Sequence, residues 1–99
     1  MNLAKVLGTV VSTRKEESLV GLKFLLLGQI DADGKATGAT LVAADAVGAG
    51  VGELVLFATG SSARQTVLTD KRPCDAVIMA IVDSWEIEGV ERYKKGRDD

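Results

Sequence analysis

Histidine is absent from the 99 residues, and the chain has one cysteine, Cys74, and one proline, Pro73. Without histidine there is no Ser-His-Asp triad and no histidine general base, and a single thiol completes neither a Cys/His zinc site nor an intrachain disulfide. An unpaired thiol is consistent with a reducing compartment, so we expect a cytoplasmic protein. The composition predicts a protein that is not an enzyme and that holds no metal and no cofactor.

Aromatic residues and excess positive charge are also scarce. The chain has 4% aromatic residues, and its 12 basic and 14 acidic residues give a net charge of −2. Modules that bind single-stranded nucleic acid stack bases on aromatic side chains along a basic groove, so we expect no nucleic acid partner. No apolar run approaches the roughly 18 residues of a membrane-spanning helix, so we expect no membrane partner.

Apolar residues, in contrast, are in surplus. With glycine counted and tyrosine omitted they make up about 57% of the chain, against a typical 45–50%. A single domain of this length leaves a large part of its surface in water, so this surplus exposes apolar groups unless a partner covers them. The composition predicts self-association.

The apolar stretches are short, rich in Val, Leu and Ile, and separated by Gly, Asp and Lys, which is typical of strands in a small barrel. The expected main strands are residues 5–13, 22–30, 40–44, 53–59 and 76–88, with a possible short strand at 90–93 and a charged tail from 94 that frays. Ser62 and Gln65 have the spacing of a capping box, which predicts one short helix after Gly60.

Several strands carry apolar residues on both faces. In the expected strand 22–30, Leu25 and Leu27 alternate with Leu26 and Phe24, and the first half of 76–88 is apolar throughout. A small barrel has only one inside, so the outer face must be covered by another subunit or in part by a packed helix. This pattern predicts an all-β, antiparallel barrel that assembles through its outer surface.

Three motifs resemble chemical sites, and each has a simpler interpretation. The glycines at 48, 50 and 52 precede an expected strand rather than a helix and lack the spacing of a dinucleotide loop, so a tight turn is favoured over a phosphate site. Asp31 and Asp33 lack the other ligands of a calcium loop and favour a hairpin turn with Gly34. Asp83, Glu86 and Glu88 are acidic but have no arrangement that indicates catalysis.

A set of short strings in a fixed order carries a resemblance over about residues 1–95. The strings are LAKVLGTVVST at 3–13, VAAD at 42–45, VGAGVGE at 47–53, GSSAR at 60–64, PCDA at 73–76 and IVD at 81–83. Together they resemble the bacterial microcompartment vertex proteins, the EutN/CcmL family of carboxysome and ethanolamine-utilisation shells. The chain departs from the family pattern at Cys74, Ala80 and Trp85.

The resemblance implies one domain, residues 1–95, followed by a charged tail at 96–99. It implies a five-stranded, OB-like barrel that assembles as a cyclic homopentamer. Such pentamers close the vertices of a polyhedral shell whose flat facets are hexameric shell proteins, so the implied function is structural and the implied location is the microcompartment shell. An OB-fold nucleic-acid-binding module is the alternative function.

The resemblance also suggests where the chain touches its neighbours. Glycines allow two backbones to approach closely, and the guanidinium of Arg64 is a fork-shaped donor that fits a carboxylate of a neighbouring subunit, such as that of Asp45, Asp83 or Glu53. The residues expected at contacts between protomers or between pentamer and hexamer are Asp45, Gly48, Gly50, Gly52, Glu53, Ser61, Ser62, Arg64 and Asp83.

Overall fold

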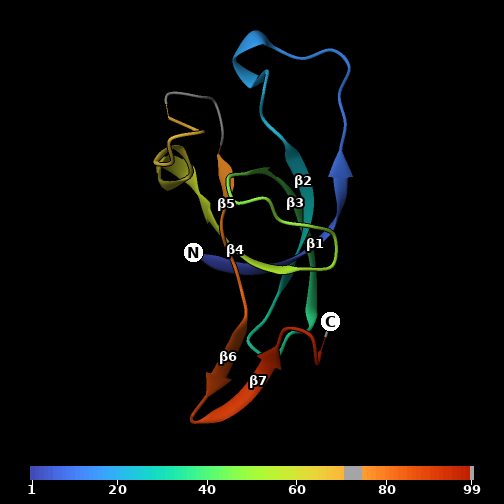
Figure 1. The fold of residues 1–99 in the computed structure, drawn as a ribbon, viewed down its shortest axis with the longest axis vertical. Helices are drawn as coiled ribbons and strands as arrows, with labels where there is room; N and C mark the ends of the chain where they lie inside the picture. Colours follow the sequence, from blue (N-terminus) through green and yellow to red (C-terminus); the bar gives the residue numbers. More distant parts are fainter. Residues whose placement is uncertain (71–74, 99) are drawn as a thin grey trace.

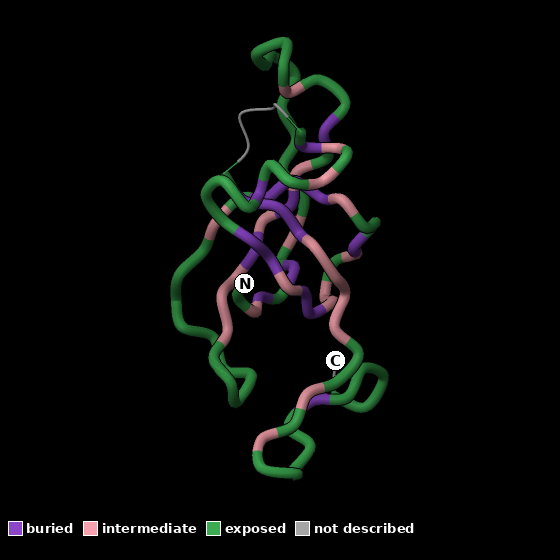
Figure 2. The backbone as a smooth tube through the Cα atoms, turned by 90° about the vertical axis from the view of Figure 1, so that its left-hand side faces the viewer, coloured by how far each residue is buried: buried purple, intermediate pink, exposed green. Residues whose placement is uncertain are grey.

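The computed structural model describes residues 1–70 and 75–98, so Pro73 and Cys74 of the PCDA motif lie outside the described residues. The molecule is elongated, with principal extents of 45 × 24 × 22 Å. A barrel occupies the middle, a long loop extends from one end and a two-stranded hairpin from the other (Figure 1). Buried residues are concentrated in the barrel, whereas both ends are mostly exposed (Figure 2).

Five strands form a closed barrel in the spatial order β1-β2-β3-β5-β4. Its strands are β1 (Asn2–Val10), β2 (Phe24–Ile30), β3 (Ala36–Asp45), β4 (Leu54–Thr59) and β5 (Ala76–Ile81). The prediction of a small five-stranded all-β barrel is confirmed. One feature differs from the expected antiparallel arrangement, because β3 and β5 run parallel. A closed ring with an odd number of strands cannot alternate in direction all the way round, so one parallel pair is unavoidable.

The barrel interior is filled by alternate residues of the strands. Phe57, Leu25, Leu27 and Ile78 are its largest fully buried side chains. The remaining buried members of this cluster are Ala4, Val6, Ala43, Ala49, Val55 and Ala76. The interior is therefore apolar and filled by side chains.

A second apolar cluster lies on the outer side of the same strands. It contains Ala44, Ala58 and Val77, and Phe24 packs against it. The short 3₁₀ helix η2 (Gly60–Arg64) covers this cluster with Ala63, which is fully buried. The outer apolar face of β5 is thus covered in part by a short helix of the same chain. This was one of the two kinds of cover that the sequence predicted, the other being a second subunit.

The prediction of one long strand over residues 76–88 is wrong, because the chain leaves the barrel after Ile81. Its second half is β6 (Ser84–Ile87), which pairs with β7 (Val90–Lys94) in a separate hairpin. Glu88 and Gly89 at the hairpin turn have φ angles of 52° and 80°, as a tight hairpin turn requires. Trp85 and Ile87 continue the odd-numbered apolar positions Val77, Met79 and Ile81, so the sequence pattern does not mark this break.

Residues 94–98 of the charged tail, which we expect to fray, make hydrogen bonds to one another and to Asp83. The amide of Lys95 donates to the carbonyl of Asp83 at 2.8 Å, and the amide of Lys94 donates to the carboxylate of Asp98 at 2.9 Å. The prediction of a capping box formed by Ser62 and Gln65 is also wrong. The residue at the N-cap of η2 is Thr59, and its side chain makes no cap hydrogen bond. A second 3₁₀ turn, η1 (Glu17–Leu19), was not anticipated from the sequence.

Candidate assembly site

The loop between β3 and β4 carries four of the residues expected at subunit contacts, and Asp45, the last residue of β3, fixes its first half. The Asp45 side chain is only 2% exposed, and its Oδ1 accepts hydrogen bonds of 3.0 Å from the amides of Val47 and Gly48. The ammonium of Lys23 lies 3.7 Å from Oδ2. Both carboxylate oxygens of Asp45 are therefore occupied within the chain.

Glu53 fixes the second half of this loop. Its Oε1 accepts a 2.6 Å hydrogen bond from the amide of Gly50, and its Oε2 forms an ion pair with Lys95. The Glu53 carbonyl also accepts from the amide of Val6 at 2.9 Å, which ties the loop to β1. Lys95 links the C-terminal segment to the barrel through this pair.

The glycines of the loop have different roles. Gly48 and Gly52 have φ angles of 77° and 90°, a conformation that other residues adopt only with strain. Gly50 does not need a positive φ, but a Cβ atom there would lie 3.2 Å from Oε1 of Glu53. Whether a neighbouring subunit also approaches these glycines remains a prediction.

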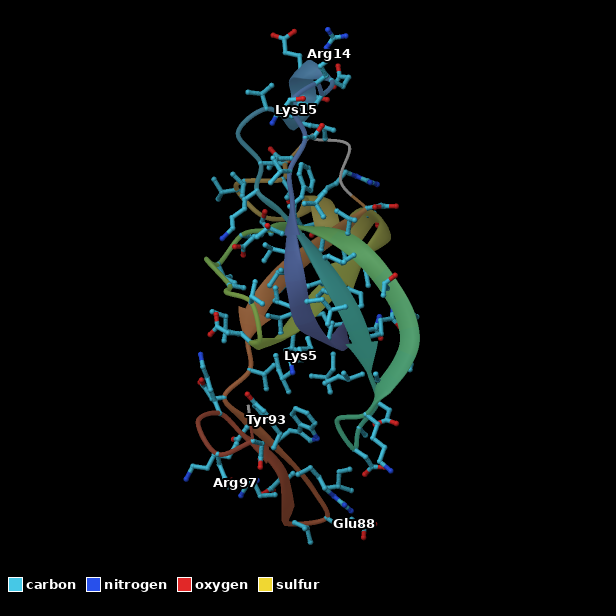
Figure 3. The ribbon with its side chains drawn as sticks, turned by 90° about the vertical axis from the view of Figure 1, so that its right-hand side faces the viewer. Lys5, Arg14, Lys15, Glu88, Tyr93 and Arg97 are labelled. Atoms are coloured by element: carbon cyan, nitrogen blue, oxygen red, sulfur yellow. The ribbon has the colours of Figure 1, made fainter. Side chains whose placement is uncertain are left out.

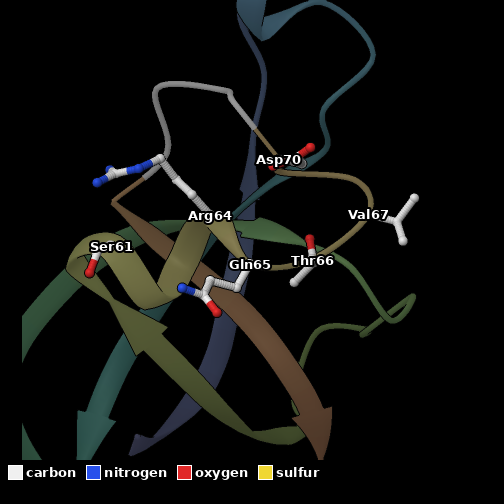
Figure 4. A pocket seen from close by; sticks show the side chains of 6 residues that line it. All are labelled: Ser61, Arg64, Gln65, Thr66, Val67 and Asp70. Atoms are coloured by element: carbon white, nitrogen blue, oxygen red, sulfur yellow. The ribbon is translucent and has the colours of Figure 1, made fainter.

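Helix η2 presents the remaining expected contact residues at the surface. Ser61, Ser62 and Arg64 are exposed, while Ala63 between them is buried. Ser61 and Arg64 line an open hollow of about 700 Å³ together with Gln65, Thr66, Val67 and Asp70 (Figure 4).

Threonine side chains hold the segment after η2 in place. The Oγ1 of fully buried Thr69 donates to the carbonyl of Ala63 at 2.7 Å and lies 2.6 Å from Oγ1 of Thr66. These threonines were not singled out in the sequence, although two hydroxyls three residues apart beside a short helix are typical of a closed polar turn.

Asp83 stands apart from η2, at the junction between β5 and β6. Its side chain is exposed, and its carbonyl accepts the hydrogen bond from Lys95. The structure thus brings Glu53 and Asp83 to the same residue, Lys95. The sequence could not indicate that link, because Lys95 is one of several charged residues in the apparent tail.

Among the described residues, two other kinds of site were looked for without result. Within residues 1–70 and 75–98, no group of three or more acidic or cysteine side chains could hold a metal ion, and no helix is long and apolar enough to span a membrane. The four aromatic residues contact other side chains of the chain: Phe57 is buried in the barrel, Phe24 packs against the outer cluster, and half-buried Trp85 stacks on Tyr93 with ring centroids 5.0 Å apart.

Residues 1–83 match the family described as ethanolamine utilisation protein EutN/carboxysome. The chain belongs to this family. Over 95 residues it is 50% identical to the carboxysome shell vertex protein CcmL of Gloeobacter violaceus, covering 96% of this chain and 95% of that protein. The solved structure of Gloeobacter violaceus CcmL superposes with a TM-score of 0.93, at 49% identity and 96% and 98% coverage.

A second solved structure carries information on assembly. The GrpN pentameric microcompartment shell protein of Rhodospirillum rubrum superposes with a TM-score of 0.77 at 46% identity, covering 88% of this chain and 98% of that one. The expected resemblance to the vertex proteins is therefore confirmed. The relatives are shell proteins rather than enzymes, in agreement with the prediction from composition.

Proposed function

We propose that five copies of this chain form a ring that closes the vertices of a bacterial microcompartment shell. The observation that carries the proposal is the near full-length match, in sequence and in barrel geometry, to shell vertex proteins, one of them pentameric. Among residues 1–70 and 75–98, ten large apolar side chains are exposed in one protomer, and they support the proposal because a monomer would leave them in water.

The finer part of the proposal concerns the neighbours of the ring. We infer that its outer rim meets flat, hexameric shell proteins, since a sheet of hexamers needs units of lower symmetry to curve and close. Among the expected contact residues with charged side chains, we assign the exposed Arg64 and Asp83 to contacts between chains, whereas Asp45 and Glu53 hold the loop between β3 and β4.

Mass in solution and shell closure test the two parts separately. Light scattering on a size-exclusion column should give five chains of 10.4 kDa, about 52 kDa. Co-expression with hexameric shell proteins should give closed polyhedra in electron micrographs, and omission of this chain should give open sheets or tubes. A monomer at micromolar concentration contradicts the ring, whereas a ring that leaves shells open contradicts only the vertex assignment.

A further inference from the structure

A cavity of about 280 Å³ lies at the junction between the barrel and the C-terminal hairpin. Its barrel side is lined by Lys5 of β1, Ile30 of β2 and Leu54 of β4. Its hairpin side is lined by Trp85 of β6 and Arg92 of β7. Junctions between structural units are frequent places for ligand sites, and ligand pockets start at roughly 300 Å³. The volume therefore suits a small molecule.

The aromatic wall of this cavity is held in one orientation. The indole N–H of Trp85 donates to the carbonyl of Ala32 at 2.8 Å, and the ring stacks on Tyr93. A Cβ atom on Gly34 would lie 3.9 Å from the indole, so the turn between β2 and β3 also approaches the ring. A wall that is already fixed does not have to be ordered when a ligand binds, and this favours binding.

The charged side chains that line the cavity are not balanced. The guanidinium of Arg92 lies 3.7 Å from the carboxylate of Asp33, and Asp98 accepts a 2.6 Å hydrogen bond from Arg97. Both carboxylates that line the cavity thus have a cationic partner. Among residues 1–70 and 75–98, Lys5 makes no ion pair. Its ammonium is left as an excess positive charge at the cavity.

The position of Lys5 follows from the alternation of β1. Ala4 and Val6 on either side are buried in the barrel core, so the side chain of Lys5 points out of the barrel. Figure 3 shows Lys5 at the end of the barrel that faces the hairpin, with Tyr93 on the hairpin side. The residues matched to the family end at 83, so the hairpin side of the cavity is not part of that match.

We propose that this cavity binds a small organic anion, a carboxylate attached to a short apolar or aromatic body. The carboxylate pairs with the ammonium of Lys5, and the body lies against Ile30, Leu54 and Trp85. A hydrogen bond between two charged groups is stronger than one between neutral groups, so the charge of the ligand decides which molecules bind. The site lies within one protomer, so the proposal does not depend on the ring and goes beyond a purely structural function.

Trp85 provides the measurement, because it is the one tryptophan of the chain and its indole N–H gives one NMR signal. Benzoate added to the assembled protein should shift that signal in a saturable way, with a Kd on the order of 1 mM, as expected for a ligand of this size. Benzamide has the same shape without the charge, and inorganic phosphate has charge without the apolar body. Both should bind about tenfold more weakly or worse. Equal shifts with all three compounds would overturn the proposal.

A substitution tests the role of the ammonium. Lys5→Met removes the charge and keeps most of the side-chain length, so it should weaken benzoate binding by about tenfold and leave benzamide binding unchanged. Lys15→Met is the matched control, because Lys15 lies at the opposite end of the molecule (Figure 3), and it should bind benzoate as the unmodified protein does. Unchanged benzoate binding by Lys5→Met would overturn the site.

Hydrogen exchange gives a second test that needs no variant. A ligand that contacts both barrel and hairpin should hold the two together, so saturating benzoate should slow exchange of the Lys95 amide, which bonds to the carbonyl of Asp83 beside the hairpin. Benzamide at the same concentration should have little effect. An unchanged exchange rate at saturating benzoate would place the ligand elsewhere and overturn the site.

The proposed site and the proposed function fail in different ways. A pentamer that does not bind benzoate contradicts the anion site and leaves the function in place. A monomer that binds benzoate through Lys5 contradicts the function and leaves the site in place.

Discussion

Asp45 illustrates how a single buried carboxylate holds a loop in shape. Two amides and an ammonium surround it, so its negative charge is satisfied although the side chain is almost fully buried. Removing a buried charged acceptor leaves its donors without partners. This lowers the free energy of unfolding by more than the hydrogen bond itself contributes.

We expect Asp45→Ala to lower the free energy of unfolding by about 2 kcal/mol, because the amides of Val47 and Gly48 lose their acceptor. Asp45→Asn is the matched control and should cost about half as much, since its amide oxygen still accepts. Urea denaturation at equal protein concentration measures both. Equal stability of Asp45→Ala and the unmodified protein would show that the loop does not depend on this side chain.

Arg64 is exposed on η2, so its loss should leave the protomer intact. We expect Arg64→Ala to change the free energy of unfolding by less than about 1 kcal/mol, as exposed charged side chains usually do, while fewer closed shells form with hexameric partners. Arg64→Lys retains the positive charge but lacks the fork-shaped donor, so it should form fewer closed shells than the unmodified protein and more than Arg64→Ala. Normal shell closure by Arg64→Ala would remove Arg64 from the contact residues.

Asp98 offers a test by pH. Hydrogen bonds from Arg97 and from the amide of Lys94 hold the pKa of Asp98 below its ordinary value. A lowered pKa means that the contact is fully present above the ordinary value near 3.8 and is lost as the pH falls through the lower, folded-state value. An NMR titration of the Lys94 amide should show this transition, and Arg97→Ala should move it upward. A transition that Arg97→Ala leaves in place would contradict the pair.

At the scale of elements, the C-terminal hairpin is joined to the barrel by few contacts. Trp85 stacks on Tyr93, and its indole N–H donates to the carbonyl of Ala32 in the β2–β3 turn at 2.8 Å. Lys95 adds its bonds to Asp83 and Glu53. The hairpin extends from the barrel like a separate unit (Figures 1 and 3), and units with few contacts open at lower free energy than the core.

We therefore expect Trp85→Ala to loosen the hairpin without unfolding the barrel. Hydrogen exchange of the Lys95 amide should speed up by tenfold or more, since an aromatic pair and a hydrogen bond together are worth more than about 1.4 kcal/mol. The rate of hydrogen exchange at the amide of Leu27 in the barrel should not change. Trp85→Phe keeps the stacking and loses only the hydrogen bond, so its effect should be smaller. Equal acceleration in barrel and hairpin would show that they unfold together.

At the scale of the whole molecule, the exposed large apolar side chains of the described residues predict a ring held by apolar contact rather than by charge. Such a ring should keep its mass when the salt concentration is raised to about 1 M, where charges are screened within about 3 Å. Static light scattering at low and high salt measures this. Dissociation at high salt would show that ion pairs hold the protomers together, with Arg64 as the first residue to examine.

Sequence by itself determined the class of the fold and the need for a partner. Short Val, Leu and Ile runs separated by glycine and charged residues set the strands, and the surplus of apolar residues exceeded what a 99-residue barrel can bury. The ordered motifs were specific enough to indicate the family. These features are local or additive, so no knowledge of distant contacts was needed.

Tertiary structure alone decided how the strands close and what covers them. The parallel β3–β5 pair follows from closing five strands into a ring, and the end of β5 at Ile81 depends on where the barrel is complete rather than on any change in the apolar pattern. The Lys95–Glu53 pair joins residues 42 positions apart. Such contacts form only when the whole chain is folded, because side chains that meet across the barrel leave no signal in the spacing of the residues around them.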